Sequence, residues 1–348
     1  MSAFDAAPTR LDEVVDPKWL TAMLAQRWPG VVVTRVEIVE TLVTMATKVR
    51  VALEIEGGGA DVPTALCIKG VLTDTGAPPS ASIVETLFYA QAAGTLGVRV
   101  PQPVHASLNA AGDNGVLVMI DQIAAGGHFC TALDPFSPDQ AIDGLDQLAK
   151  LHAEAWAGTP MFGTLWIPRF LDRISAAPIM PLSVLQDLLD GPRGAPLPPA
   201  IRSAERLQQG LERLAAQVRT RPNCLVHGDA HAGNVFRDAQ SRLGLVDWQI
   251  LQKGEWAQDV AYHLAAVLTP EDRRAHERHL LEHYLRRVAM LGGPIIDANE
   301  AWTRYRAAMV YGYFLWAITR KVDPDIIHEF VRRLGLAVDD LDSFSVVA

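Results

Sequence analysis

Residues 224–248 read CLVHGDAHAGNVFRDAQSRLGLVDW, and this stretch combines short apolar runs with polar residues that follow them. An apolar strand around Leu225 runs into His227 and Asp229, and Asn234 follows five positions after the aspartate. After a short spacer, a second apolar strand ends at Asp247. Polar residues therefore emerge repeatedly from the ends of buried strands, where their side chains can converge.

The residue types in this stretch match the needs of phosphoryl transfer. That reaction needs a carboxylate beside the attacking hydroxyl and oxygen ligands that hold Mg²⁺ against the nucleotide phosphates, because its catalysis is mostly positioning and charge neutralisation. Asp229, Asn234 and Asp247 supply these groups, and Gly254 with Asp259 adds the pattern G-x-x-x-x-D. The alternative is that Asp229 and Asn234 only cap turns between strands.

Together, H-G-D-x-x-x-x-N, D-W and G-x-x-x-x-D resemble the catalytic signature of aminoglycoside phosphotransferases, choline kinases and ecdysteroid kinase-like proteins. The resemblance covers the C-terminal part of the chain. It implies an α+β, two-lobed, protein-kinase-like fold, with an N-terminal antiparallel-sheet lobe and a larger, mainly helical C-terminal lobe. The implied activity is ATP-dependent and Mg²⁺-dependent transfer of the γ-phosphate to a hydroxyl of a small molecule.

The same resemblance implies a role for each residue of the signature. Asp229 is the catalytic base, and Asn234 and Asp247 are the Mg²⁺ ligands. His227 and Asp259 support the catalytic loop by hydrogen bonds. A direct part for His227 in catalysis stays open, and so does plain packing, because a histidine after an apolar strand is often a packing residue.

On the nucleotide side, Lys69 lies inside a predicted strand, in ALCIKGV. An ammonium between apolar neighbours needs a partner, because an unpaired buried charge is costly. Glu85, on the predicted helix IVETLFY, matches the family position that pairs with this lysine and aims it at the phosphates. The alternative is a surface lysine and a solvated glutamate.

The turn expected to cover the phosphates departs from the kinase pattern, because residues 41–49, TLVTMATKV, contain no glycine. The hydroxyls of Thr44 and Thr47, or the side chain of Lys48, are candidates to replace the usual loop amides in nucleotide binding. Residues 117–122 are expected to connect the lobes and to meet the adenine edge with their backbone.

The N-terminal lobe is expected to begin with a helix after Asp16-Pro17 that ends near Pro29-Gly30. The other predicted elements are strands at 31–43, 49–55, 64–72 and 115–123 and a helix within 80–95. Gly57-Gly58-Gly59 reads as a hairpin turn and not as a phosphate loop, because no helix opens after it.

The flexible sequence at residues 124–127 is expected to separate a lobe of residues 1–123 from a lobe of residues 124–348. The larger lobe is predicted to contain helices from Gln140 to Trp156 and from Ala261 onward, with short strands around Leu225, Val235 and Leu245. The apolar run from Ala307 to Ile318 is too short to span a membrane and reads as a buried helix.

The net charge, the N-terminal sequence and the cysteines limit the partners and the cellular compartment that we expect for this protein. The net charge is −9 and the arginines form no basic stripe, so nucleic acid is not expected as a partner. The N-terminus shows no secretory signal, and three widely separated cysteines suit a reducing compartment. We therefore expect a cytoplasmic protein without a membrane span.

Protein substrates are not expected either. Only eleven residues separate Asp247 from Asp259, which leaves no room for the activation segment of protein kinases, and Trp248-Gln249 replaces their Phe-Gly. Two other function classes stay open: a catalytically silent nucleotide-binding module and a hydrolase. The hydrolase has no G-x-S-x-G or H-E-x-x-H motif to support it.

The acceptor itself cannot be derived from the sequence. The apolar segments between residues 160 and 199 suit either a greasy alcohol or an ordinary core. Acids at Asp339, Asp340 and Asp342 would instead attract a cationic acceptor. In HERHLLEH, residues 276–283, three histidines share a helical face, which we interpret as a solvated face more readily than as a metal site.

Overall fold

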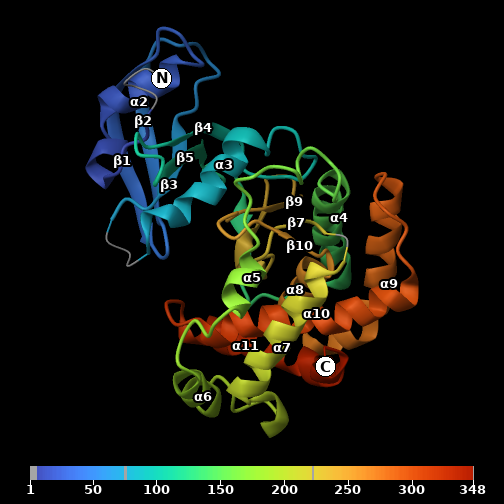
Figure 1. Ribbon diagram of the computed structural model, residues 1–348. Coiled ribbons are helices and arrows are strands. Elements are labelled where there is room, and N and C mark those ends of the chain that lie inside the picture. Colours follow the sequence, from blue (N-terminus) through green and yellow to red (C-terminus); the bar gives the residue numbers. More distant parts are fainter. Residues whose placement is uncertain (1–5, 74–76, 222, 348) are drawn as a thin grey trace.

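In a computed structural model that describes residues 6–73, 77–221 and 223–347, the chain folds into two lobes (Figure 1). The smaller lobe contains an antiparallel sheet with the strand order β1-β2-β3-β5-β4. Its strands are β1 Val32–Val43, β2 Thr47–Glu56, β3 Ala65–Gly70, β4 Pro103–Leu108 and β5 Gly115–Ile120. The larger lobe is mainly helical, so the predicted α+β, two-lobed fold is confirmed.

Two short helices, α1 Leu11–Val14 and α2 Pro17–Ala25, lie at the start of the smaller lobe. Helix α2 begins where the sequence predicts, because the Asp16 carboxylate accepts hydrogen bonds from the first free amides and Pro17 fits the first turn. Its apolar side packs on one face of the sheet. The shared core contains Leu20, Met23, Leu24, Val33, Val49, Val51, Leu66, Ile68, Val116 and Val118.

The three consecutive glycines lie in the connection between β2 and β3, as predicted. Their φ angles are +71°, +72° and +92°, a backbone conformation that side chains with a Cβ rarely adopt. The triple glycine therefore serves the hairpin and not a phosphate site.

Helix α3, Ile83–Gln91, lies beside β4 and β5 and connects the lobes. Phe88 of α3 packs with Leu117 and Met119, which alternate with the residues that face α2, and this cluster is continuous with the core of the larger lobe. Helix α3 is thus fixed by both lobes, and the division between residues 123 and 124 stays a prediction.

Strand β5 ends at Ile120 and not at Ile123, the end that the sequence predicts. The reason is Asp121, whose carboxylate accepts hydrogen bonds from the amides of Ile123 and Ala124 and turns the chain. The other oxygen of this carboxylate accepts a bond from Arg50 Nε of β2 at 2.8 Å. The connection between the lobes is therefore tied to the sheet.

The larger lobe surrounds a buried helix, α10 (Figure 1). Its helices are α4 Pro138–Glu154, α5 Phe170–Ser175, α6 Leu182–Asp190, α7 Ala204–Arg219, α8 Ala257–Val267, α9 Pro270–Met290, α10 Ala298–Ile318, α11 Pro324–Asp340 and α12 Ser343–Val346. Single 3₁₀ turns occur at η1 Pro79–Ser82, η2 Pro199–Ile201 and η3 Ala232–Asn234. The predicted apolar run lies in α10, and no helix within the described ranges is long and apolar enough to cross a membrane.

Five short strands place the polar residues of the central sequence stretch. They are β6 His128–Phe129, β7 Cys224–Val226, β8 Val235–Arg237, β9 Leu243–Leu245 and β10 Gln252–Gly254, arranged as a sheet β6-β8-β9 and a pair β10-β7. Strands β7, β8 and β9 are predicted from the sequence. Strands β4, β6 and β10 and helices α5 to α7 are not. Strand β4 shows no alternation of burial, β6 and β10 are only two and three residues long, and the helices lie where no motif marks them.

Candidate active site

Three charged side chains from different parts of the chain meet at the junction of the lobes. Lys69 of β3 reaches across to α3, where its Nζ lies 2.6 Å from Glu85 Oε2. The same Nζ lies 2.9 Å from Asp247 Oδ1, after β9 in the larger lobe. The Lys69 and Glu85 side chains are each only 4% exposed, whereas Asp247 is 19% exposed. The structure thus brings all three sequence candidates together.

The pKa values of this group follow from its burial and its charges. Burial alone would lower the pKa of Lys69, but Asp247 and Glu85 raise it above its usual value. Burial would raise the pKa of Asp247, but Lys69 and then Lys48 hold it well below its usual value. Burial raises the pKa of Glu85, against the pull of Lys69. Lys69 and Asp247 are therefore charged at neutral pH.

The residue after Asp247 fixes this arrangement to helix α3. The Trp248 backbone amide donates to Glu85 Oε1 at 3.2 Å, and the Trp248 ring stacks on Phe88 of α3 with 3.9 Å between ring centroids. Asp247 itself has a φ of +66°, which is uncommon for a residue with a side chain and is characteristic of functional sites. This backbone conformation lets the aspartate and the tryptophan point to different partners.

The loop that follows β7 begins at His227 and is held by Asp259 of helix α8. Asp259 is fully buried, and its two oxygens accept hydrogen bonds from the amides of His227 at 2.6 Å and of Gly228 at 2.8 Å. His152 of α4 lies 3.1 Å from the same carboxylate and also contacts Tyr284. Each buried amide at the start of the loop is thus satisfied.

His227 connects the two strands that carry the acidic residues. Its Nε2 donates to the carbonyl of Val246 at 2.9 Å, and its Nδ1 accepts the amide of Asp229 at 3.2 Å. Burial lowers the pKa of His227 against the pull of Asp259 and Asp229, so the ring is neutral. Both ring nitrogens are therefore engaged with backbone groups, which is the geometry of a supporting residue.

The carboxylate of Asp229 is oriented by neighbours on both of its oxygens. Tyr262 donates to Oδ1 at 3.0 Å, and Asn234 Nδ2 donates to Oδ2 at 3.0 Å and to the backbone carbonyl at 2.9 Å. Burial would raise the pKa of Asp229, but His231, with Nε2 at 3.6 Å, keeps it below its usual value. An ionised, oriented and 29% exposed carboxylate can accept a proton from a bound hydroxyl.

Asn234 and Asp247 offer oxygen atoms that suit a hard divalent cation. Because the Asn234 amide nitrogen is bound to Asp229, its amide oxygen is the end available to a ligand. Groups of three or more His, Cys, Asp or Glu side chains with metal-binding geometry do not occur among the described residues. One carboxylate and one amide fit Mg²⁺ in the way it binds with nucleotide phosphates, which supply the remaining ligands.

The glycine-free turn between β1 and β2 places its candidates differently. Thr47 is fully buried, and its hydroxyl shares a 2.8 Å hydrogen bond with Thr73, while the Thr44 hydroxyl donates to the carbonyl of Ala46. Lys48 instead points at Asp247, with 3.4 Å between Nζ and Oδ2. Of the three candidates, Lys48 is the one that reaches the other predicted site residues.

Several residues of the site are not identified from the sequence. Tyr262 lies three positions after Asp259 on α8, a spacing that puts both on one face of the helix and is the signal that could find it. Trp316 of α10 donates to the Tyr262 hydroxyl at 2.6 Å, and His263 donates to the carbonyl of Ala230 at 2.8 Å. These aromatic helix residues look like ordinary core in the sequence.

The remaining sequence candidates have partners outside the site. His283 of the three-histidine face pairs with Asp146 of α4 at 2.8 Å. Asp340 is bound by Arg273 and Arg274 of α9, which leaves this acid of the C-terminal cluster unavailable to a cationic acceptor.

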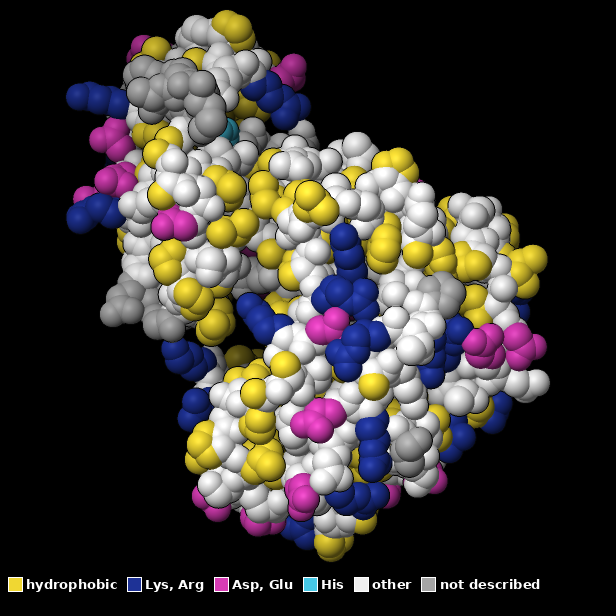
Figure 2. All heavy atoms as spheres, viewed as in Figure 1, with side chains coloured by type: hydrophobic (Ala, Val, Ile, Leu, Met, Phe, Trp, Pro, Cys, Tyr) yellow, Lys and Arg dark blue, Asp and Glu magenta, His cyan; other side chains and the backbone are white. Residues whose placement is uncertain are grey.

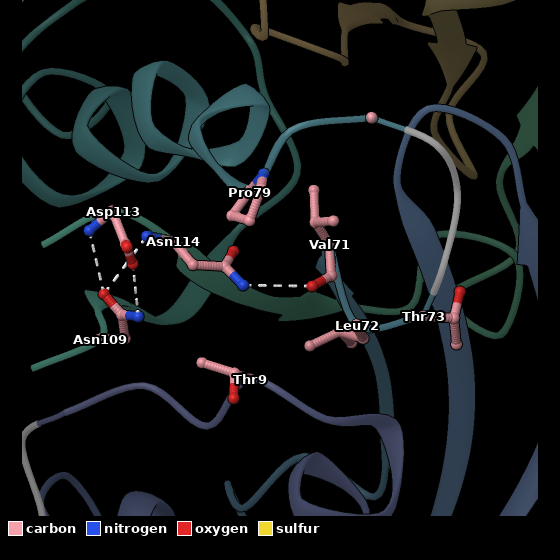
Figure 3. A pocket seen from close by; sticks show the side chains of 9 residues that line it. Thr9, Val71, Leu72, Thr73, Pro79, Asn109, Asp113 and Asn114 are labelled. Atoms are coloured by element: carbon pink, nitrogen blue, oxygen red, sulfur yellow. Dashed lines mark hydrogen bonds between the residues drawn. The ribbon is translucent and has the colours of Figure 1, made fainter. Parts of the chain in front are cut away.

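Figure 2 shows a recess between the two lobes, bordered by Lys and Arg side chains. Two hollows elsewhere include none of the predicted catalytic, metal-binding or phosphate-binding residues, although Ile120 and Gln122 of the predicted lobe connection line the second one. One of about 430 Å³ lies in the smaller lobe, where the polar groups of Asn109, Asp113 and Asn114 bind one another and the Val71 carbonyl (Figure 3). The other, of about 410 Å³, lies behind the connection between the lobes, where Arg242 is paired with a neighbouring aspartate.

Comparison with known families identifies the larger part of the chain. The phosphotransferase enzyme family matches residues 70–307, about two thirds of the chain. The match includes Glu85 and the whole stretch from Asp229 to Asp259, but it begins one residue after Lys69. No curated protein matches the chain.

A solved structure with a TM-score above 0.5 shows the fold. The GDP and kanamycin complex of the aminoglycoside phosphotransferase APH(2″)-IIIa is 16% identical, with a TM-score of 0.52, and the alignment covers 92% of this chain and 98% of that one. Choline kinase LicA from Streptococcus pneumoniae is 14% identical (TM-score 0.49, 94% and 98% covered). A choline/ethanolamine kinase family protein from Mesorhizobium loti is 16% identical (TM-score 0.48, 95% and 98% covered).

Proposed function

The chain belongs to the phosphotransferase enzyme family, and we propose that it is a kinase that moves the γ-phosphate of ATP to a hydroxyl of a small molecule, with Mg²⁺ required. The observation that carries the proposal is the meeting of Lys69, Glu85 and Asp247 across the lobes. Lys69 is buried and stays charged beside the partly exposed carboxylate of Asp247, and a lysine in this position is suited to bind nucleotide phosphates.

In this reaction, Asp229 orients the acceptor hydroxyl and takes its proton while the hydroxyl oxygen bonds to the γ-phosphorus. The bond between that phosphorus and the bridging oxygen breaks, and ADP leaves. Asp229 is ionised before the acceptor arrives, because its neighbours keep its pKa below the usual value. Tyr262 and Asn234 hold its two oxygens, so the carboxylate does not need to reorganise during transfer. Activity is expected to lack a steep rise around pH 7.

Asp247 and the amide oxygen of Asn234 would hold Mg²⁺, and Lys69 would bind the nucleotide phosphates with Glu85 positioning it. Bound Mg²⁺ supplies neutralisation of the phosphate charge. His227 and Asp259 position the loop, because their hydrogen bonds are to backbone groups. Thr47 supports the turn through Thr73 and does not contact the nucleotide directly in this proposal.

The proposal also includes the broader expectations from the sequence. The acceptor is a small hydroxylated molecule and not a protein, because Asp247 and Asp259 are joined by β10 and the start of α8 with no long segment between them. Nucleic acid is not expected as a partner because the net charge is −9. The lobe boundary lies between residues 123 and 124. We place the reaction in the cytoplasm, which suits three cysteines that form no disulfide within the described residues.

Calorimetric titration of ATP and GTP, with and without Mg²⁺, tests the proposal first. Wild-type protein is expected to bind a nucleotide only weakly without Mg²⁺, Asp247→Ala to lose the gain from Mg²⁺, and Asn234→Ala to lose less of it. Nucleoside diphosphate release is then followed with amino sugars, amino alcohols, sugars and sterols as acceptors. Absence of nucleotide binding, or an Asp247→Ala protein that binds like wild type, would contradict the proposal.

The alternative of a catalytically silent nucleotide-binding protein has no observation in its favour. Such a protein would be expected to have lost part of the machinery, whereas Asp229, Asp247 and Lys69 are all present and oriented. The acceptor screen also tests this alternative, because a silent protein would bind the nucleotide and release no diphosphate with any acceptor.

A further inference from the structure

Two lysines lie directly opposite each other on the neighbouring strands β2 and β3, beside the proposed nucleotide site. Lys48 of β2 and Lys69 of β3 are partners in the antiparallel register, so their side chains leave the sheet on the same face. Like charges at directly opposite positions destabilise a sheet unless an anion lies between them. Here Asp247 fills that role, with one oxygen 2.9 Å from Lys69 Nζ and the other 3.4 Å from Lys48 Nζ.

The two lysines differ in what remains if Asp247 turns to another partner. Lys69 keeps Glu85 at 2.6 Å and is almost fully buried. Lys48 is 31% exposed, and Asp247 is its only anionic partner within the described residues. A cation bound by Asp247 would therefore leave Lys48 charged, close to that cation, and in need of a new anion.

The turn before Lys48 offers little else to a phosphate. It contains no glycine, the Thr44 amide donates to the carbonyl of Ala46, and the Thr44 and Thr47 hydroxyls are bound within the protein. The backbone amides that usually cradle phosphates in such a turn are thus at least partly engaged. A side chain must supply the missing positive charge.

We propose that Lys48 is a second phosphate-binding lysine, which holds Asp247 before the nucleotide binds and then transfers to its terminal phosphates. This inference rests on the proposed function, and it adds a residue that lies outside the matched part of the chain. The charges balance both without and with the nucleotide. In the free protein, Glu85 and Asp247 neutralise the two lysines. When Asp247 binds the cation, the phosphates of the nucleotide become the anionic partner of Lys48. Lys48 thereby replaces a glycine-rich turn.

Binding of a nucleotide series measures this role without any turnover. Wild type, Lys48→Met, Lys48→Arg and the control Lys18→Met are titrated with AMP, ADP and ATP in the presence of Mg²⁺. Lys18 is an exposed lysine of the same lobe, on α2. Lys48→Met is expected to weaken ATP binding about tenfold or more, because a charge-assisted hydrogen bond is lost. AMP binding is expected to change less than about twofold, and Lys48→Arg to recover most of the ATP affinity.

A purely structural Lys48 would give a different result. If it only steadies Asp247, Lys48→Met would lower the unfolding temperature of the free protein and weaken all three nucleotides alike. Equal discrimination between ATP and AMP in Lys48→Met and wild type would overturn the inference while leaving the proposed kinase intact. Wild-type protein that binds none of the nucleotides would overturn both.

Discussion

The proposed catalytic loop, residues 227–234, and the turn between β1 and β2 with the start of β2, residues 44–48, both border the candidate site, but they are held in different ways. Asp259 satisfies the buried amides at the start of the loop, and Tyr262 and Asn234 hold its catalytic carboxylate. The turn contributes one partly exposed lysine with a single ion pair at 3.4 Å. One side of the site is assembled in advance, and the other is arranged to change partners.

Physical chemistry explains why the two regions are built so differently. Buried polar groups are costly unless they are hydrogen-bonded, so the loop can exist only with a complete set of partners, and these partners also fix its geometry. A partly exposed ion pair contributes little to stability, so it can be exchanged for a phosphate at low cost. Removal of an aspartate carboxylate from the loop or from its support should therefore have larger effects than changes on the nucleotide side.

The largest effect is expected for Asp229→Asn, which removes the base from the preassembled side. Turnover should fall at least about a hundredfold, because a positioned base contributes that much or more. The fold and nucleotide affinity should remain, because an asparagine can still accept the Tyr262 bond. Steady-state kinetics with the best acceptor and a thermal melt check both points. A loss below about tenfold would show that Asp229 is not the base.

Asp259→Ala removes the carboxylate that holds the same loop, and its main effect should be a lower free energy of unfolding. It leaves the buried amides of His227 and Gly228 without an acceptor, so we expect a loss of about 3–5 kcal/mol in the free energy of unfolding. Denaturant titration measures it. Asp238→Ala is the matched control, because Asp238 also accepts two backbone amides but does so in an exposed turn. Asp238→Ala should lower the free energy of unfolding by about 1 kcal/mol. Equal losses for the two variants would show that the buried position of Asp259 gives it no special role in holding the loop.

Asp229 and Asp259, the residues of these first two tests, could be predicted from the sequence, because they belong to a signature with fixed spacing and follow or face buried strands. The fold was predictable for the same reason, together with the β-branched runs of β1 to β3. Strand β10 and the early end of β5 were not, since three residues carry no period and the turn depends on one hydrogen-bonding carboxylate, Asp121.

Contacts between distant parts of the chain were equally out of reach. Lys48 meets Asp247 across 199 positions, and Trp316 reaches Tyr262 across 54. Buried aromatic residues on helices fit a core pattern whether or not they also hold a catalytic group, so hydrophobic periodicity cannot separate the two uses. The pair Lys69 and Glu85 could be predicted because a buried lysine needs a partner and because Glu85 matches the position that pairs with this lysine in the family that the chain resembles.

Acid should weaken the loop through His263, whose ring donates to the carbonyl of Ala230. Burial lowers its pKa to about 4, whereas the unfolded chain titrates near 6.5. Between these values the unfolded state binds the extra proton, so stability falls as the pH falls from 6.5 to 4, by roughly 3 kcal/mol in total.

The matched variant for this test is His263→Asn, which keeps a donor near Ala230 and does not titrate. Denaturant titrations of both proteins from pH 7 to pH 4 isolate the histidine, because other groups cancel in the difference. Among them is Glu255, whose pKa burial raises to about 7 against the pull of Arg304. The contribution of Glu255 to the pH dependence has the opposite sign, since the stability that depends on Glu255 falls as the pH rises from 4.5 to 7. Parallel curves for the two proteins would refute the assignment to His263.

On the nucleotide side, Lys69 and Glu85 should behave as one unit. If Lys69→Met and Glu85→Gln remove the same positioning, the double variant should be little worse in kcat/KM than the worse single variant. A coupling of about 1 kcal/mol or more would support the pair, and a value below about 0.5 kcal/mol would indicate independent roles. Slow ATP hydrolysis to water serves as the readout, so no natural acceptor is needed.

The smallest effect is expected for Tyr262→Phe, which removes one of the bonds to Asp229 and keeps the aromatic packing. Turnover should fall roughly fivefold to tenfold, corresponding to about 1 kcal/mol for one hydrogen bond, with the KM of the acceptor unchanged. Because the lost bond stabilises the charged carboxylate, the acid limb of the kcat profile should also move to higher pH.

Tyr313→Phe is the matched control for this last change, since Tyr313 is also buried and donates a single bond, to the carbonyl of Ile201 away from Asp229. Tyr262→Phe should lose more stability than Tyr313→Phe, because it also leaves the buried Trp316 ring nitrogen without its acceptor. Only Tyr262→Phe should change kcat and its pH profile. If the two variants behaved alike in kcat, the hydroxyl of Tyr262 would serve packing alone, and Asn234 by itself would suffice to orient the catalytic carboxylate.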